Sequence, residues 1–430
     1  MPVTITSATI SQARAILITC AITFVVLFTF SHVFDSPPLS PAKGGEESGV
    51  EFHHTRANRL APSRAVKQGD PPGSVSEEIP ISEDVIPHGV SVFTADNFVK
   101  HLVLPRMRSE DVTWLTYLPE DLNIIPKTYL IDPDKDITLP GTLTVPINKG
   151  HEAQAYLTYI IEHYDNLPDI AIFTHAHSTA WHNNDLQLSS TPVMLLELNY
   201  RRVVEHGYMN LRCHWHPGCP GWIKLNTTEY DDFKKEEFVM HKSFMELFPR
   251  EVMRDGVPDI LSTPCCAQFA VTRARIKQHA KERYIFWRKW ITNTPLSDEI
   301  SGRVMEYVWH FIFAAPSLSK NADRALNCPA EHVCYCDGYG YCFGNGDRFK
   351  RWAEKRDKAR ELSERLKAAE EGVGKTEGED EAWREEGIKR WKMELKKMEG
   401  ECETELQYAR RRGSDAKMRR GEVGELEFSG

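Results

Sequence analysis

The sequence predicts an α/β domain, a mostly parallel sheet flanked by helices, preceded by one transmembrane helix and followed by a charged tail. Three observations predict this arrangement: residues 15–34 carry no charge, apolar strands alternate with helices over residues 91–346, and about half of residues 347–430 are charged. Alternating strands and helices are typical of a parallel sheet that helices cover on both faces. The net charge of −9 argues against a nucleic-acid-binding protein.

The first element is the apolar run AILITCAITFVVLFTFSHVF at residues 15–34. A helix rises about 1.5 Å per residue, so about 20 apolar residues span a bilayer. A buried core helix and a cleaved signal peptide are the alternatives, but a signal peptide usually has a shorter apolar core and a small-residue cleavage site. We expect an uncleaved anchor, with residues 1–14 in the cytosol and the core domain in the ER or Golgi lumen or at the cell surface.

Residues 35–90 form the predicted stem. They are rich in Pro, Ser, Gly and Glu and lack the apolar periodicity of a helix or a strand, so we expect disorder. A short tail, an anchor, a stem and a large domain are typical of membrane enzymes of the secretory pathway and of many shed receptors. This layout alone therefore fixes no reaction.

The core domain, residues 91–346, alternates predicted strands with predicted helices. Strands are expected at 100–104, 123–131, 170–174 and 267–271, and helices at 149–164, 192–198, 273–292 and 298–313. The helix at 149–164 has apolar residues at helical spacing, and the run IAIFT at 170–174 is typical of a buried strand. Ligand sites in such sheets lie at the carboxyl ends of the strands, so we expect the site in the loops that follow them.

Eight of the ten cysteines lie in the core domain, which is typical of disulfides in an oxidising compartment. They are Cys213, Cys219, Cys265, Cys266, Cys328, Cys334, Cys336 and Cys342. Zinc is the alternative, but its cysteine ligands usually come as pairs separated by about two to four residues, a spacing that these cysteines lack. We expect at least two bridges, Cys213–Cys219 and one within Cys328–Cys342. Asn226 begins the single N-glycosylation sequon, N-T-T, which a glycan can occupy in a lumenal domain.

Five segments between Phe98 and Gly346 resemble one protein family. They are NKGHEAQAYLTYIIEHYDNLPDIAIFTHAHSTAWHNND, NLRCHWHPGCP, CCAQFAVTRARI, EISGRVMEYVWHFIF and CYCDGYGYCFG. In these segments the chain resembles the fungal domain of unknown function 3431. The resemblance implies a fungal source and membership of that family, and it supplies no activity. The segment LVLPRM departs from the family pattern, because Pro105 stands where the first strand would continue.

A second, more distant resemblance is to GT-A type glycosyltransferases, which are α/β domains often carried on a single anchor and stem. It implies a nucleotide sugar as donor, a glycan or protein as acceptor, and a divalent metal held by a D-x-D motif at the end of a central strand. Here His175-Ala176-His177 follows the IAIFT strand instead. A D-x-D, Asp132-Pro133-Asp134, follows the second strand, where Asp-Pro more often indicates a turn.

The predicted cofactor-binding residues open the helix at 149–164. They are Asn148, Lys149, Gly150, His151 and Glu152. Free N–H groups and the helix dipole bind phosphate at such an end, Gly150 permits close approach, and Lys149 can pair with a diphosphate. A plain helix cap is the alternative, because Asn148 is a good N-cap residue and Glu152 suits a first turn.

Glu306 is the predicted catalytic residue, acting as a general base on an acceptor hydroxyl. On one continuous helix over 298–313 it would share a face with His310, four residues later. The structural alternative is an ion pair with Arg303, three residues earlier on the same predicted helix.

The predicted metal ligands are His175, His177, His182 and His310. His175 and His177 end a strand two residues apart, so they point to the same face. His182 follows in a loop, and His310 would come from a facing helix. Imidazole suits Mn, Fe, Zn or Cu better than Mg, and we expect Mn²⁺ with a nucleotide sugar. Histidines that only bond to loop backbone are the alternative.

The tail, residues 347–430, holds 22 basic and 22 acidic residues. A helix is expected at 349–370, followed by disorder with a second helix at 383–398, and little contribution to the core. These patterns together favour a single-pass membrane glycosyltransferase. A non-catalytic glycan-binding protein and a metal-dependent hydrolase that uses the histidines are the alternatives.

Overall fold

The computed structural model describes residues 89–132, 143–314, 327–371 and 381–424. These residues all belong to one unit of the chain, Pro80–Gly430. Within the described ranges every helix is too short or too polar to cross a bilayer. The predicted anchor at 15–34, nearly all of the predicted stem and the end of the D-x-D motif at 132–134 lie outside these ranges.

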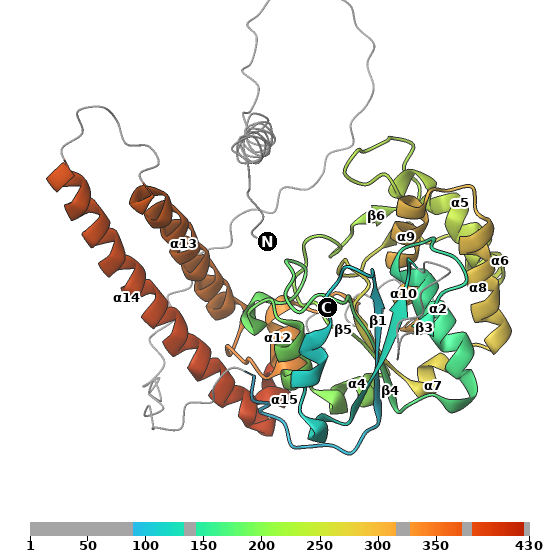
Figure 1. Cartoon of the computed structure of the whole chain (residues 1–430), viewed down its shortest axis with the longest axis horizontal. Coiled ribbons are helices and arrows are strands. Elements are labelled where there is room, and N and C mark those ends of the chain that lie inside the picture. Colours follow the sequence, from blue (N-terminus) through green and yellow to red (C-terminus); the bar gives the residue numbers. More distant parts are fainter. Residues whose placement is uncertain (1–88, 133–142, 315–326, 372–380, 425–430) are drawn as a thin grey trace, which may run out of the picture. The chain divides into compact units, whose positions relative to one another are not determined.

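A six-stranded sheet forms the centre of this unit (Figure 1). In spatial order its strands are β3 (Leu143–Thr144), β2 (Ile124–Leu130), β1 (Lys100–Arg106), β4 (Ile170–Phe173), β8 (Phe269–Thr272) and β5 (Tyr208–Asn210). The first four strands are parallel, and β8 is antiparallel to both of its neighbours. The predicted α/β class with a mostly parallel sheet is therefore confirmed.

Strand β1 continues through Pro105 to Arg106, beyond the predicted end of this strand. Proline lacks the N–H that a sheet ladder needs, so it is rare in central strands. Here the last pair between β1 and β4 joins Val103 to Phe173, and from Leu104 onward β1 pairs only with β2. Pro105 therefore lies where one edge of the strand is already free.

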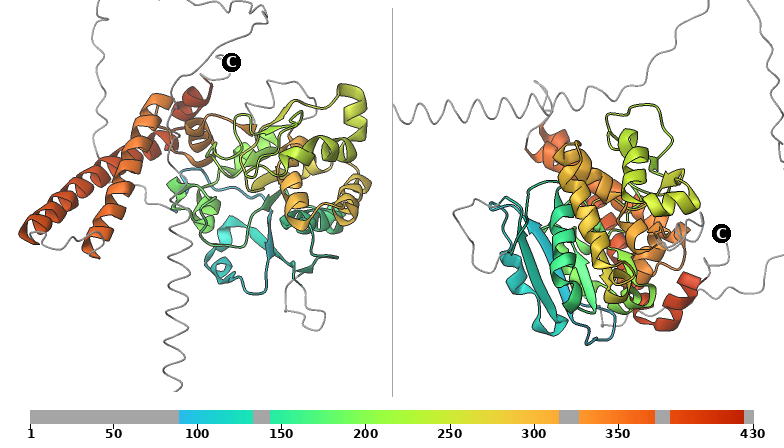
Figure 2. Two further views of the ribbon diagram at one scale, coloured as in Figure 1. Left: turned by 90° about the horizontal axis from the view of Figure 1, so that it is seen from above. Right: turned by 90° about the vertical axis from the view of Figure 1, so that its right-hand side faces the viewer.

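Successive side chains of each strand face opposite sides of the sheet, so two hydrophobic cores form. Val103 and Phe173 belong to one core, and Leu102, Leu104 and Ile172 to the other. The first core is covered by α2 (Glu152–His163), α5 (Glu237–Leu247), α6 (Pro249–Asp255), α7 (Arg273–Ile276), α8 (Lys281–Asn293), α9 (Asp298–Glu306) and α10 (Trp309–Phe313). The second is covered by α3 (Thr191–Glu197), α4 (Tyr200–His206) and α12 (Glu331–Tyr339) (Figures 1 and 2).

Short elements complete the described part of the core. They are the 3-10 helices η1 (Thr113–Tyr117), η2 (Glu120–Leu122), η3 (Tyr164–Asn166) and η4 (Asp185–Gln187), and a two-stranded sheet of β6 (Ile223–Lys224) and β7 (Ile260–Leu261).

Two helices that the sequence predicts as continuous are interrupted. The segment 273–292 forms α7 and α8, and the segment 298–313 forms α9 and α10. Tyr307 and Val308 have ψ angles of 7° and −6°, far from the helical value of about −42°. Both side chains are buried and apolar, so the hydrophobic pattern continues through the break and conceals it. Glu306 and His310 consequently lie on different helices, and the prediction that they share one helical face is wrong.

The tail forms the helices α13 (Gly346–Glu370), α14 (Glu381–Ser414) and α15 (Ala416–Gly424). Helices α13 and α14 pair along their lengths (Figure 1). The Cys342 N–H donates to the Ala409 carbonyl at 3.0 Å, and the Gly344 N–H donates to Glu422 at 2.8 Å. Ala409 and Arg410 are buried against the second core. The prediction that the tail contributes little to the core is therefore wrong for residues 381–424, because a few buried positions in a charged helix are enough to dock it.

Candidate functional site

The strand order creates a topological switch point between β1 and β4. The chain passes from β1 to β2 and β3 on one side and then returns to β4 on the other. Ligands of open α/β sheets bind beyond the carboxyl ends of the strands at such a point. The segments that follow β1 and β4 meet there, because Nε2 of His177 lies 3.1 Å from Oε1 of Glu110. The candidate site is therefore the carboxyl edge of β1 and β4.

Cys266 connects two predicted site residues at this edge. Nε2 of His175 donates to the Cys266 carbonyl at 2.8 Å, and the Cys266 N–H donates to the Glu306 carboxylate at 2.6 Å. Because β8 runs antiparallel to β4, the loop that leads into β8 lies beside the end of β4. The rings of His175 and His182 are 4.7 Å apart. We call His182, His175, Cys266 and Glu306 the His–Cys–Glu row.

The two histidines of this row are neutral at pH 7. Burial lowers the pKa of His175, and burial together with the neighbouring His175 lowers the pKa of His182 to about 3. A carbonyl can only accept a hydrogen bond, so the proton of His175 is on Nε2. The Nδ1 atom of His175 therefore keeps its lone pair.

Glu306 is a partly buried carboxyl group with weakened acidity. Burial is the largest cause that raises its pKa to about 7, and the charge of Glu152 adds to it, although the Cys266 N–H acts in the opposite direction. Arg303 forms ion pairs with Glu236 and Glu299 at 3.3 and 3.2 Å. The alternative interpretation, in which Arg303 pairs with Glu306, is therefore not what the structure shows. A carboxylate that titrates near neutral pH is suited to accept a proton during a reaction.

The predicted phosphate-binding loop at residues 148–152 is already occupied by a carboxylate of the chain. Oδ1 of Asp298 accepts hydrogen bonds from the N–H groups of Gly150 and His151 at 2.6 and 3.2 Å. Lys149 donates to the Thr294 carbonyl. Helix α2 begins at Glu152, and Asn148 does not cap it. The anion that the helix end attracts is thus Asp298, which comes from the start of α9.

The four histidines predicted as metal ligands do not form one ligand set. Among the described residues, two groups of three His, Cys, Asp or Glu side chains have ligand atoms within 4.8 Å of one another, and neither contains a histidine. His177 pairs with Glu110, and His175 bonds to loop backbone, as the alternative interpretation expected. His310 is buried in α10, where burial lowers its pKa to about 3. A metal held by these four residues is therefore no part of the reaction proposed below.

All eight core cysteines form disulfides, so the expected minimum of two bridges is confirmed. The bridge predicted within residues 328–342 is Cys336–Cys342. The predicted bridge Cys213–Cys219 is wrong: these residues pair with Cys334 and Cys328, which are 121 and 109 residues away. Helix α12 and the residues before it pack beside the loop after β5, so both cysteines of the short loop meet partners outside it. The fourth bridge joins the neighbours Cys265 and Cys266.

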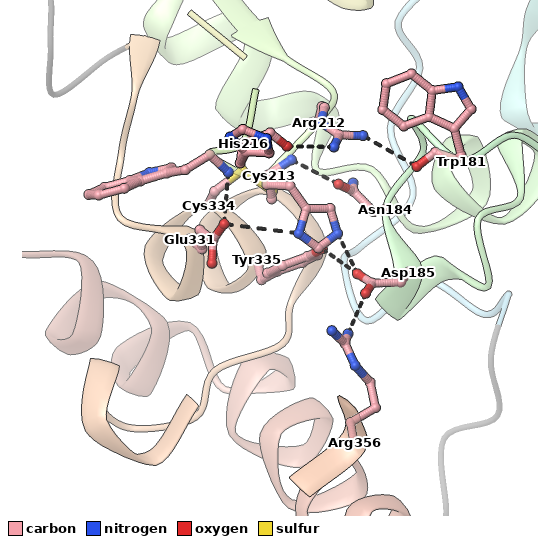
Figure 3. A network of polar contacts seen from close by, with 12 residues as sticks. Trp181, Asn184, Asp185, Arg212, Cys213, His216, Glu331, Cys334, Tyr335 and Arg356 are labelled. Carbon is pink, nitrogen blue, oxygen red and sulfur yellow. Dashed lines mark hydrogen bonds and ion pairs between the residues drawn. A yellow bond between two sulfur atoms is a disulfide. The ribbon is translucent and has the colours of Figure 1, made fainter. Parts of the chain in front are cut away.

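A polar network surrounds the Cys213–Cys334 bridge (Figure 3). Asp185 is its centre: it pairs with His214, accepts a hydrogen bond from Tyr335 at 3.2 Å, and pairs with Arg356 of α13 at 2.6 Å. Burial alone would raise the pKa of Asp185, but the hydrogen bond from His214 and the charge of Arg356 lower it to about 2. Because Tyr335 lies on α12 and Arg356 on α13, this network fastens both helices to the core.

Sequence reasoning missed three contributors to the site, namely Glu110, Asp298 and the Cys265–Cys266 bridge. Adjacent cysteines are visible in the sequence, and their adjacency could have been read as a bridge between neighbours. Glu110 follows a predicted strand, which is the position where site residues are expected. Nothing in the sequence indicates Asp298, because its partners lie 148 and 147 residues away.

Comparisons with known proteins identify a family but no relative of known activity. Neither the curated proteins nor the solved structures contain a match to the chain. Residues 102–337 match the family described as "Protein of unknown function (DUF3431)". This match covers more than half of the 430 residues, and it includes all of the His–Cys–Glu row. The chain therefore belongs to the DUF3431 family.

Proposed function

We propose that the domain transfers a sugar from a nucleotide sugar to the hydroxyl group of an acceptor, with Glu306 as the general base. The observation that carries this proposal is the position and acidity of Glu306. Its carboxylate is held by the Cys266 N–H at the carboxyl end of β4, and its pKa is raised to about 7. The adjacent switch point between β1 and β4 is where nucleotides bind in sheets of this topology.

The proposed step is a displacement at the anomeric carbon of the donor. Glu306 accepts the proton of the acceptor hydroxyl while the hydroxyl oxygen forms a bond to that carbon. The bond from the carbon to the diphosphate breaks, and the nucleoside diphosphate leaves with the electron pair. A base with a pKa near the working pH combines a useful ionised fraction with a strong pull on the proton.

Trp181 supports recognition of a sugar at the same edge. Its side chain is 71% exposed, and its ring lies 5.5 Å from that of His182, at the end of the His–Cys–Glu row. The Arg212 guanidinium lies 5.4 Å from the Trp181 ring centre. An exposed indole beside polar groups can stack on the apolar face of a sugar.

The test is release of nucleoside diphosphate by the full-length chain from a panel of nucleotide sugars, with mixed glycan acceptors. Glu306→Gln should lower the transfer rate by about 100-fold or more. It should still be stabilised by the donor, by about 2.7 kcal/mol at 100 times Kd. The matched control is Glu299→Gln, on the exposed side of the same helix α9, which should transfer at the wild-type rate.

Two outcomes would reject this function. If no nucleotide sugar stabilises the chain but glycans do, and Trp181→Ala abolishes that effect, the protein is a glycan-binding protein. If donor is consumed equally by the wild type and by Glu306→Gln, Glu306 is not the base.

We further propose that the core domain lies in the lumen of the secretory pathway or at the cell surface, anchored by residues 15–34. Four disulfides among eight core cysteines support an oxidising compartment. Asn226 is exposed and so is accessible to a glycan. Protease should leave the core intact in sealed microsomes, and a glycosidase should increase its mobility. Digestion of the core in sealed vesicles would contradict this topology.

A further inference from the structure

The bridge between Cys265 and Cys266 differs from the other three because it joins two neighbouring residues. Their Cα atoms are 3.7 Å apart, as in any pair of neighbours in the chain. Cys266 and Ala267 have φ angles of 81° and 48°, in the left-handed region that residues with a Cβ rarely adopt. The turn is therefore held in a conformation that the chain would not adopt by preference.

Stability does not explain this bridge. A disulfide stabilises a fold mainly by closing a long loop of the unfolded chain, and a bridge between neighbours closes none. The Cys213–Cys334 and Cys219–Cys328 bridges close loops of 121 and 109 residues. Strained and accessible disulfides are the ones that are reduced most easily, and the Cys266 side chain is partly exposed.

The two sulfur atoms lie close to the carboxylate of Glu306. The ligand atoms of Cys265, Cys266 and Glu306 all lie within 4.8 Å of one another. Three hydrogen bonds hold the backbone in place independently of the sulfur–sulfur bond: the Cys265 N–H donates to the Pro217 carbonyl at 3.0 Å, and Cys266 bonds to both His175 and Glu306. The loop can therefore keep its shape when the bridge opens.

We propose that reduction of the Cys265–Cys266 bridge creates a binding site for a soft divalent metal ion, Zn²⁺ or Cd²⁺, with both thiolates and Glu306 as ligands. A phosphine reductant supplies two electrons and takes the oxygen of a water molecule, whose two protons give two thiols; two reductant thiols supply the electrons and the protons together as they form their own disulfide. Each thiol releases its proton when the metal binds. Two sulfur ligands and one carboxylate leave a fourth tetrahedral position open, as in zinc sites that exchange water or substrate.

The consequence for activity rests on the proposed function. A metal ion on Glu306 would occupy the carboxylate that the proposed transfer uses as its base. Reduction followed by zinc should then stop transfer, and a chelator should restore it. The metal site itself is tested without nucleotide sugar, so its failure is distinct from failure of the proposed transfer.

The experiment measures Zn²⁺ binding to the full-length chain by calorimetry, before and after titration with a phosphine. The phosphine becomes its oxide by taking the oxygen of water. Alkylation and mass spectrometry should show that Cys265 and Cys266 are released before the other six bridged cysteines. The oxidised chain should bind no zinc at this site, and the reduced chain should bind one equivalent.

Variants assign the ligands. Cys265→Ser with Cys266→Ser should abolish the zinc equivalent, and Glu306→Gln, which keeps both thiols, should weaken binding at least tenfold. Cys402→Ser, which removes the free thiol of the described residues, is the matched control and should change nothing. Glu422→Gln tests the other group within ligand distance, which contains Cys336 and Cys342, and should also change nothing. Equal binding to the oxidised chain, binding that survives Cys265→Ser with Cys266→Ser, or earlier opening of another bridge would overturn the proposal.

Discussion

Arg410 of α14 and Glu197 of α3 form an ion pair of 2.6 Å, although they are 213 residues apart and each side chain is only 1% exposed. Glu197 also accepts hydrogen bonds from Gln187 and Tyr341 at 3.1 and 2.8 Å. Arg410 also donates a hydrogen bond to the Val90 carbonyl, at 2.5 Å. The charged tail thus supplies the positive charge that balances the buried carboxylate of Glu197.

Arg410→Ala should destabilise the domain by about 3–5 kcal/mol, because it leaves the buried Glu197 carboxylate without its partner. The free energy of unfolding, measured by denaturant titration, checks this. Lys392→Ala is the matched control, since Lys392 pairs with Glu370 at an exposed site on the same helix and should cost less than about 1 kcal/mol. Deletion of residues 381–430 should have at least the effect of Arg410→Ala, and an unchanged melting temperature would refute this role of the tail.

Glu306→Gln should make the protein more stable above neutral pH. The pKa of Glu306 rises from 4.5 to about 7 on folding, so the folded state binds the proton more strongly and loses stability as pH rises through this interval. Glutamine mimics the protonated form at every pH. The variant should therefore exceed the wild type by roughly 3 kcal/mol at pH 8 and equal it near pH 4. The free energy of unfolding of both proteins, measured at pH 4 and pH 8, tests this. A difference between variant and wild type that does not change with pH would contradict the raised pKa of Glu306.

The activity of the wild type should follow the same titration. If deprotonated Glu306 is the base, the rate of sugar transfer should increase as pH rises through about 7 and then level off. The residual activity of Glu306→Gln should lack this step. Initial rates over the pH range on both proteins test the prediction, and an identical profile in the variant would assign the titration to another group.

Non-reducing mass spectrometry should find peptides that join Cys213 to Cys334 and Cys219 to Cys328. Loss of either bridge by paired serine substitution should cost about 2–5 kcal/mol, because each closes a long loop. Removal of the Cys265–Cys266 bridge should cost far less. A peptide that joins Cys213 to Cys219 would show that the connectivity is different.

Asp298→Ala should destabilise the domain by about 1–2 kcal/mol, because the N–H groups of Gly150 and His151 lose their acceptor. Asp298→Asn keeps an oxygen in the same place and should lose less stability.

Since the helix end at residues 150–151 is filled by Asp298, Lys149→Ala should leave the affinity for nucleotide sugars unchanged. A large loss of affinity in Lys149→Ala would show that residues 148–152 bind the phosphates after all.

The sequence predicted the parallel part of the sheet well, because its strands are apolar runs bounded by polar or helix-starting residues. The segments at 100–104, 123–131 and 170–174 match β1, β2 and β4 closely. The breaks at 277–280 and 307–308 were not predictable from periodicity, since buried apolar residues continue through the second of them. Hydrophobic periodicity predicts that a segment is helical, but it does not predict where packing against the rest of the domain interrupts the helix.

The candidate site was predictable only in part. Glu306 and His175 were identified individually, but the Cys266 peptide that joins them was not, because backbone groups carry no sequence signal. The pairing of Cys213 with Cys334 depends on how α12 packs, which the spacing between cysteines does not encode. The same holds for Arg410, whose surroundings in the sequence are those of an ordinary solvated helix.

The ion pair between Glu197 and Arg410 also sets an order of events during synthesis. A ribosome makes the central strands and Glu197 long before it makes Arg410, so the Glu197 carboxylate of the nascent domain lacks its countercharge while much of α12 to α14 is still being translated. Domains fold as units as the chain emerges, and contacts distant in sequence form last. The second core of this domain, which includes Leu406 and Ala409 of α14, can therefore close fully only near the end of translation.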